Sequence, residues 1–182
     1  MGGWLGRSLT AGDRLPLGPP THGRGAGRVP RVDALAQPLS PVVVRVLIGP
    51  QRDRFQENAE AVLQSAPYLV TPASNRMGFR LHGPAIGHLR GADIISDATA
   101  LGSLQVPGSG QPILLMADRQ TTGGYPKLAT VITADLGLVA QCAPGDSIRF
   151  QVCTPDEAMA ALIERERFVM AVETTRDEHI RS

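Results

Sequence analysis

The residues best suited to chemistry lie in segment 117–127, which directly follows an apolar run. The segment combines an acid, an amide, two hydroxyls, a phenol, a lysine and two adjacent glycines: Asp118, Gln120, Thr121, Thr122, Gly123, Gly124, Tyr125 and Lys127. Lys127 is the one lysine among 18 basic residues, and its point charge suits a carboxylate, carboxyphosphate or phosphate. Asp118 and Tyr125 could orient that charge or transfer protons. We predict that Asp118, Tyr125 and Lys127 are catalytic, and that the other five residues named in this segment bind substrate.

The paired glycines allow backbone N–H groups to approach a ligand closely. A polar hairpin turn, with the glycines in the bend and Tyr125 lying over the end of a barrel, explains the same residues equally well.

Two further polar clusters are candidates for substrate binding. In segment 74–80, Asn75 precedes Arg76 and Arg80, and two guanidinium groups four residues apart could clamp an anion. Ion pairs on a solvated strand face are a slightly favoured alternative. In segment 105–112, Gln105 and Gln111 could hydrogen-bond a small amide, although the Pro-Gly turn between them requires no function.

The pattern around these clusters predicts a mainly β protein with two short helices. Apolar and β-branched runs recur about every ten residues between Gly/Pro turns, which favours a barrel or a sandwich. We expect strands at 42–48, 68–71, 76–81, 93–96, 104–106, 113–116, 129–133, 138–141 and 147–153. A first amphipathic helix spans 55–66. A second begins at Pro155, where Thr154 and Glu157 form a capping box, and frays from Thr174.

Composition narrows the function classes. The chain has 182 residues, a net charge of +1, 20 glycines and 15 prolines, so neither global disorder nor a strongly basic nucleic-acid binder is expected. No apolar run approaches the ~20 residues of a membrane span. Two cysteines make no disulfide framework, which favours a reducing, cytoplasmic compartment. The four histidines are scattered, so we expect no metal site.

Four motifs together make the sequence recognisable: 49–55, 74–81, 102–112 and 118–127, in that order and spacing. From about Gly2 to about Ala161 the chain closely resembles the biotin-dependent carboxyltransferase family called allophanate hydrolase subunit 2, or KipA. Most bacterial members are assigned as the C subunit of the ATP-dependent 5-oxoprolinase. The same module forms part of the carboxyltransferase domain of urea carboxylase.

The resemblance implies a cyclophilin-like β-barrel in one subunit of a hydrolase that opens 5-oxoproline to glutamate, with ATP used by the complex. Its partners would be two further subunits, one KipI-like and one LamB/YcsF-like. The alternatives are a urea carboxylase module that uses carboxybiotin, so that biotin is its cofactor, and a non-catalytic regulatory KipA-like protein. No P-loop occurs in the sequence, so the residues themselves assign no ATP site.

The resemblance also sets the expected domain organisation. Family members are usually longer, so we expect 1–41 to be the remnant of a preceding lobe plus a Gly/Pro-rich linker, and 42–182 to be the C-terminal barrel lobe. On this expectation the chain is truncated at its N-terminus and is inactive alone.

Overall fold

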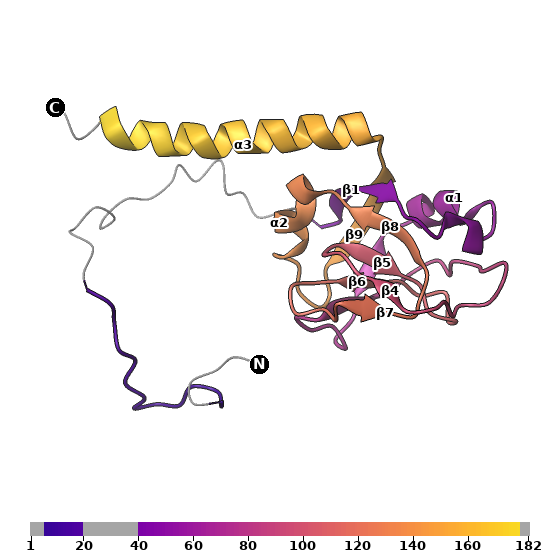
Figure 1. Cartoon of the computed structure of the whole chain (residues 1–182), viewed down its shortest axis with the longest axis horizontal. Helices are drawn as coiled ribbons and strands as arrows, with labels where there is room; N and C mark the ends of the chain where they lie inside the picture. The colour runs from indigo at the N-terminus through magenta and orange to yellow at the C-terminus, as the bar shows by residue number, and fades with distance from the viewer. Residues whose placement is uncertain (1–5, 20–39, 179–182) are drawn as a thin grey trace. The chain divides into compact units, whose positions relative to one another are not determined.

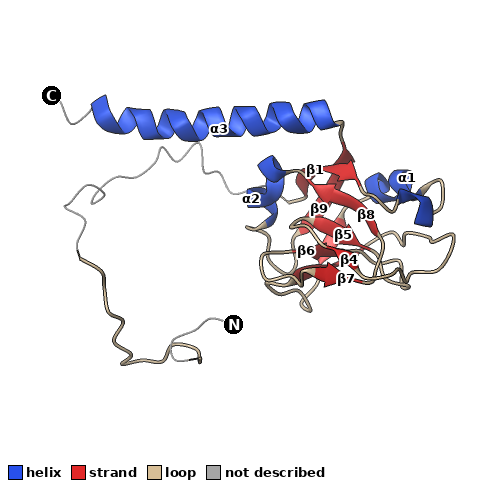
Figure 2. Ribbon diagram, in the orientation of Figure 1, coloured by secondary structure: helices blue, strands red, loops and turns tan. Residues whose placement is uncertain are grey.

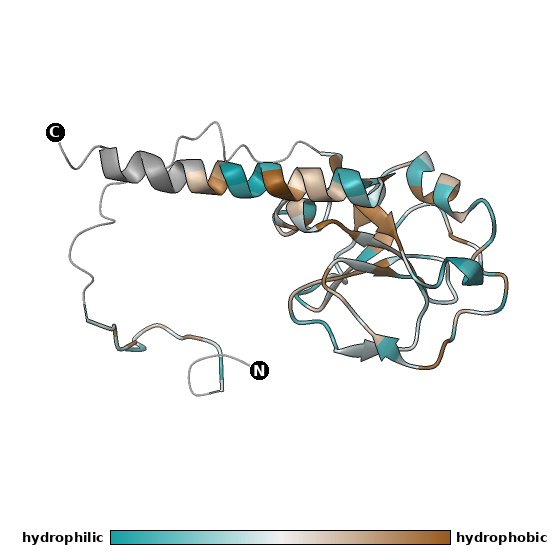
Figure 3. Ribbon diagram, turned by 45° about the horizontal axis from the view of Figure 1, so that its top comes forward, coloured by the Kyte–Doolittle hydropathy of each residue, from teal (hydrophilic) through white to brown (hydrophobic). Residues whose placement is uncertain are grey.

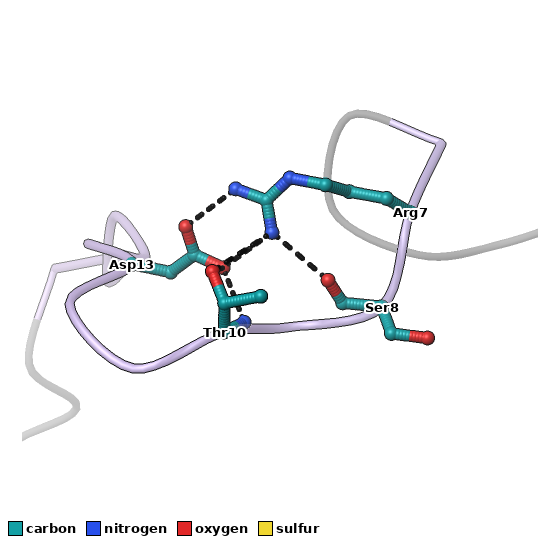
Figure 4. Close-up of polar contacts among 4 residues, drawn as sticks. All are labelled: Arg7, Ser8, Thr10 and Asp13. Atoms are coloured by element: carbon teal, nitrogen blue, oxygen red, sulfur yellow. Dashed lines mark hydrogen bonds and ion pairs between the residues drawn. The ribbon is translucent and has the colours of Figure 1, made fainter.

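The structure is a computed structural model that describes residues 6–19 and 40–178, and the chain divides into two units, 1–35 and 36–182 (Figure 1). In the first unit a turn is closed by Arg7 and Asp13, whose Nη2 and Oδ1 atoms lie 2.7 Å apart (Figure 4). This guanidinium, with the Thr10 backbone N–H, lowers the pKa of Asp13 to about 2. Most of the expected lobe remnant and linker, 1–41, lies outside the described residues.

Seven strands of the second unit form a closed barrel, which confirms the prediction of a mainly β fold (Figure 2). The strands are β1 (Val42–Ile48), β2 (Tyr68–Val70), β3 (Gly78–His82), β5 (Ser103–Gln105), β6 (Ile113–Leu115), β8 (Lys127–Val131) and β9 (Ser147–Val152). Their order around the barrel is β1-β8-β5-β6-β3-β2-β9. All neighbours are antiparallel except β9 and β1, which pair in parallel with Val44 opposite Phe150.

Alternation along the strands explains the core. Val42, Val44 and Val46 are buried, whereas Val43 between them is exposed, because successive side chains point to opposite faces of a strand. The Tyr68 and Phe150 rings pack with centroids 5.7 Å apart. Burial raises the pKa of Tyr68 to about 12, and its hydroxyl donates to the Pro84 carbonyl at 2.9 Å.

The described residues also form four short helices and one long helix. They are η2 (Arg52–Arg54), α1 (Ala59–Ser65), η3 (Thr133–Asp135), α2 (Leu136–Val139) and α3 (Pro155–Glu178). The predicted capping box forms: the Thr154 N–H donates to Glu157 Oε2 at 2.7 Å, and the Glu157 N–H donates to Thr154 Oγ1 at 3.3 Å. Helix α3 continues to Glu178, beyond the expected end at Thr174. Met159 and Ile163 on this helix are exposed, and Figure 3 shows hydrophobic colouring on part of α3 as well as on barrel strands.

Three local predictions were wrong. Segment 138–141 is not a strand: Leu138 and Val139 end α2, and 140–141 form a turn, because so short an apolar run does not let periodicity separate helix from strand. Segment 93–96 is a loop in which Ile95 is 95% exposed, and the strand beside it is β4 (Asp97–Ala98). The strand expected at 76–81 begins only at Gly78, so Met77 lies in the turn before β3 and is exposed.

A second, two-stranded sheet joins β4 to β7 (Thr122–Gly123), with Asp97 opposite Gly123. Among residues 6–19 and 40–178, no helix has the length and apolar character needed to span a membrane. The same residues contain no group of three or more metal-ligating side chains.

Asp135, at the end of η3, ties the helical segment to the barrel and generates the first prediction. Its side chain is buried, and it accepts hydrogen bonds from the Arg45 N–H at 2.8 Å, Nε at 2.9 Å and Nη2 at 2.7 Å. We expect Asp135→Ala to lower the free energy of unfolding by about 2 kcal/mol, because it leaves these donors unpaired. Urea unfolding followed by circular dichroism measures this loss.

The matched control is Glu166→Ala, which removes an exposed acid from α3. It should change the free energy of unfolding by less than about 0.5 kcal/mol. Equal losses in the two variants would contradict the role given to Asp135.

Candidate functional site

The described part of the barrel carries a pocket of about 280 Å³ in which all three polar clusters meet. It is lined by Asn75, Met77, Gly78, Arg80, Gln105, Pro107, Ile113, Leu115, Gln120 and Tyr125. Five of these were predicted from the sequence as site residues, and they come from segments that lie far apart along the chain. Their roles in binding and catalysis stay predictions.

Strand register explains why these residues meet. Ile113 of β6 lies opposite Arg80 of β3 on one side and Gln105 of β5 on the other, so the three occupy one row across the sheet. The alternate residues Leu104 and Leu114 belong to the buried core. The pocket therefore lies on the outer face of the barrel wall.

Gln105 points outward from the barrel yet is only 1% exposed, because a second layer covers it. That layer is formed by residues 94–99 and 120–126, which we call the β4–β7 ribbon. A Cβ atom on Gly123 would lie 2.4 Å from Gln105 Nε2, so any larger residue here requires the enclosed Gln105 amide to move. The Gln105 Nε2 donates to the Tyr125 carbonyl at 3.4 Å.

Backbone hydrogen bonds hold the two halves of the ribbon together. The Thr99 N–H donates to the Thr121 carbonyl at 3.0 Å, and the Ile94 N–H donates to the Gly124 carbonyl at 2.8 Å. The Thr99 hydroxyl also donates to the Gln120 carbonyl. These bonds fix the backbone of the residues that present the Gln120 and Tyr125 side chains to the pocket.

Lys127 opens β8 beneath the ribbon, and its side chain is 4% exposed. Its Nζ lies 2.8 Å from Asp97 Oδ2, and this contact lowers the pKa of Asp97. Gln51 bonds to both partners: its Nε2 donates to Asp97 Oδ2 at 3.1 Å, and its Oε1 accepts from the Lys127 N–H at 3.1 Å. Lys127 is thus oriented by Asp97 and Gln51, not by Asp118 or Tyr125 as the sequence suggested.

Sequence reasoning missed Asp97 because it is 30 positions away from Lys127 and belongs to no motif. Gln51 lies in the first recognised motif, 49–55, and that position was the one indication in the sequence that it belongs near the site. Neither was assigned a role.

The remaining predicted residues do not line the pocket. Asp118 pairs with Arg76 at an exposed site, with Nε 3.1 Å from Oδ2, so Arg76 and Arg80 form no common clamp. The Gln111 amide is occupied by Gly83, accepting from its N–H at 2.9 Å and donating to its carbonyl at 3.0 Å. The other predicted residues that lie in the ribbon without lining the pocket are Thr121, Thr122, Gly123 and Gly124.

The two adjacent glycines provide a sharp test of the packing. Gly123→Ala should lower the free energy of unfolding by about 1–2 kcal/mol, because the new methyl group displaces the enclosed Gln105 amide. At Gly124 the nearest atom to a new Cβ is the Ile94 carbonyl oxygen at 3.6 Å, an ordinary contact. Urea unfolding of both variants makes the comparison.

Gly124→Ala is the control, and it should be neutral or stabilising by up to about 1 kcal/mol, because alanine restricts the unfolded chain. The two-layer arrangement is refuted if both variants behave alike.

Comparison with known proteins identifies the family of this chain. The family model for the carboxyltransferase domain, subdomain A and B, matches residues 1–152. The C subunit of 5-oxoprolinase from Escherichia coli K12 is 36% identical over 172 residues, which cover 92% of this chain and 53% of that protein. The same subunit of Haemophilus influenzae is 35% identical over 181 residues, covering 98% and 56%.

A solved structure supports the fold. The urea amidolyase of K. lactis superposes with a TM-score of 0.62 at 25% identity, covering 75% of this chain and 8% of that one. The chain spans about half the length of the 5-oxoprolinase subunits it matches. With a family model matched over most of its length and a barrel shared with a solved relative, this chain belongs to the carboxyltransferase domain family, subdomains A and B.

Proposed function

We propose that this chain is part of the C subunit of an ATP-dependent 5-oxoprolinase, a hydrolase that converts 5-oxoproline to glutamate, and that its pocket binds 5-oxoproline. Two relatives that are 35% and 36% identical are each named as the C subunit of a 5-oxoprolinase, which supports the proposal. The pocket supports it independently, through the kinds of side chain that line it.

The observation that carries the proposal is the Arg80 guanidinium. Among the described residues it has no ion-pair or side-chain hydrogen-bond partner, whereas the neighbouring Arg76 is neutralised by Asp118. A free guanidinium at a small pocket favours a carboxylate, to which it donates in a bidentate fashion. 5-Oxoproline carries one carboxylate beside a cyclic amide.

The cyclic amide finds complementary groups in the same pocket. The Gln120 side chain offers both an amide N–H₂ donor and a carbonyl acceptor. Asn75 offers its N–H₂ group, because its Oδ1 already accepts from the Met77 N–H at 2.9 Å, and Gln105 offers its Oε1, because its Nε2 donates to the Tyr125 carbonyl. On this proposal they bind the ring carbonyl and ring N–H, and the apolar Ile113 and Leu115 contact the ring methylenes. Tyr125 is the predicted catalytic residue whose side chain lines the pocket, and we assign proton transfer to its phenol.

ATP and the remaining catalytic groups belong, on this proposal, to a cytoplasmic complex with two partner subunits, one KipI-like and one LamB/YcsF-like. A pocket of about 280 Å³ with one guanidinium suits a small monoanion and not the polyanionic triphosphate. The residues that line it therefore do not fit ATP, and we derive no ATP-dependent step from them.

Carboxyl transfer to urea is the second candidate. The K. lactis urea amidolyase shares the barrel, and three side-chain amides in one pocket also suit urea. Biotin would then be supplied on another segment or protein. Urea leaves the Arg80 charge without a partner, which favours the first proposal.

Substrate binding tests the role of Arg80 directly. By calorimetry, Arg80→Gln should weaken 5-oxoproline binding about tenfold or more, because it removes a charge-assisted contact. The neutral carboxamide of 5-oxoproline should bind weakly to the unaltered protein and be insensitive to the substitution.

Arg90→Gln is the matched control, because Arg90 is exposed and lies outside the pocket. It should leave the affinity unchanged. Equal affinity for 5-oxoproline and its carboxamide would refute carboxylate recognition by Arg80.

Activity tests the assignment to a complex. Glutamate release from 5-oxoproline with ATP should require the two partner subunits together with this chain, because the pocket lining in the described part of the chain does not fit ATP. Turnover of urea with carboxybiotin in place of 5-oxoproline would establish the second candidate. Partner binding without either activity would point to the regulatory KipA-like protein.

A further inference from the structure

Asp97 is the charged partner of the one lysine in the chain. Among the described residues it is the carboxylate within ion-pair distance of Lys127 Nζ, at 2.8 Å. The Lys127 side chain is 4% exposed and that of Asp97 is 49% exposed, so a buried ammonium relies on a partly solvated carboxylate. An unpaired buried charge is strongly unfavourable, so this contact is worth more than an exposed ion pair.

The pair joins two layers of the structure. Lys127 is the first residue of the barrel strand β8, and Asp97 is the first residue of the ribbon strand β4. Gln51, which precedes η2, bonds to both and completes a three-residue anchor. Strands β4 and β7 are two residues long, and so short a two-stranded sheet is not stable without such support.

The anchored ribbon contributes part of the pocket lining. Gln120 and Tyr125 reach the pocket from the ribbon. Gly123, which pairs with Asp97 across the two strands, is the residue that lies against the Gln105 amide. A movement of Asp97 away from Lys127 therefore changes the position of three pocket side chains at once.

We infer that Asp97 is a positioning residue, which holds the β4–β7 ribbon on the barrel through Lys127 and thereby places Gln120, Tyr125 and Gln105 around the substrate. The identity of that substrate rests on the proposed function, whereas the anchoring does not.

Hydrogen exchange measured by mass spectrometry tests the anchoring. In Asp97→Asn the amides of 94–99 and 120–126 should exchange about three- to tenfold faster, since the carboxylate contact is lost. Amides of β2 and β9 on the other side of the barrel should keep their rates. Asp93→Asn, an exposed acid on the same loop, is the control and should change neither set.

Two further variants separate positioning from a general loss of stability. Asp97→Glu keeps the charge and should restore most of the protection. The double variant Asp97→Asn with Lys127→Met removes the buried charge together with its partner, so it folds even if Asp97→Asn does not. It should show the same fast exchange confined to the ribbon.

Binding of 5-oxoproline supplies the functional readout. The dissociation constant should rise in Asp97→Asn by about the same three- to tenfold factor and recover in Asp97→Glu. Unchanged ribbon exchange, equal acceleration throughout the barrel, or fast ribbon exchange with unaltered binding would each overturn the inference. If the unaltered protein binds no 5-oxoproline, the proposed function fails, and the exchange rates still decide whether Asp97 anchors the ribbon.

Discussion

Parallel pairing of β1 with β9 closes the barrel, and the position of every pocket residue depends on that closure. Val44 of β1 lies opposite Phe150 of β9, so the two ends of the strand series are hydrogen-bonded to each other. Closure removes both free edges of the sheet. It also fixes β8 on the other side of β1, and β8 in turn sets the register of β5, which carries Gln105.

The pocket is built on the outside of this closed wall, a placement that requires a cover. The outward row of Arg80, Ile113 and Gln105 would be solvated if the barrel stood alone, yet Gln105 is only 1% exposed and lines the pocket. The β4–β7 ribbon provides the enclosure, and glycine at position 123 allows it to approach the wall. Wall and cover are thus separate units of structure that are joined by side chains as well as by backbone.

Charge is distributed unevenly around the site. Lys127 is neutralised by Asp97 beneath the ribbon, and Arg76 is neutralised by Asp118 at an exposed site. Arg80 remains as the uncompensated cation at the pocket among the described residues. The other polar groups lining the pocket are neutral, and this single uncompensated charge is the basis on which we propose a carboxylate ligand.

The sequence by itself determined the elements whose signals are local. The β-branched run 42–48, the capping box at Thr154 and Glu157, and the polar clusters that contain Arg80, Gln105 and Tyr125 were all identified from nearest-neighbour patterns. The spacing of the strands was compatible with either a barrel or a sandwich, and the family resemblance favoured the barrel.

Tertiary structure alone decided which polar groups pair with one another. Asp97 reaches Lys127 across 30 positions, Gln111 is occupied by Gly83 and Arg76 by Asp118, and no periodicity or motif records these contacts. Leu138 and Val139 end a helix and not a strand, and Val139 belongs to the buried core from this helix. Local patterns report hydrogen bonding and burial within a few residues. Strand register and barrel closure bring distant side chains within reach of one another, and those long-range contacts decide which charges at the pocket are paired.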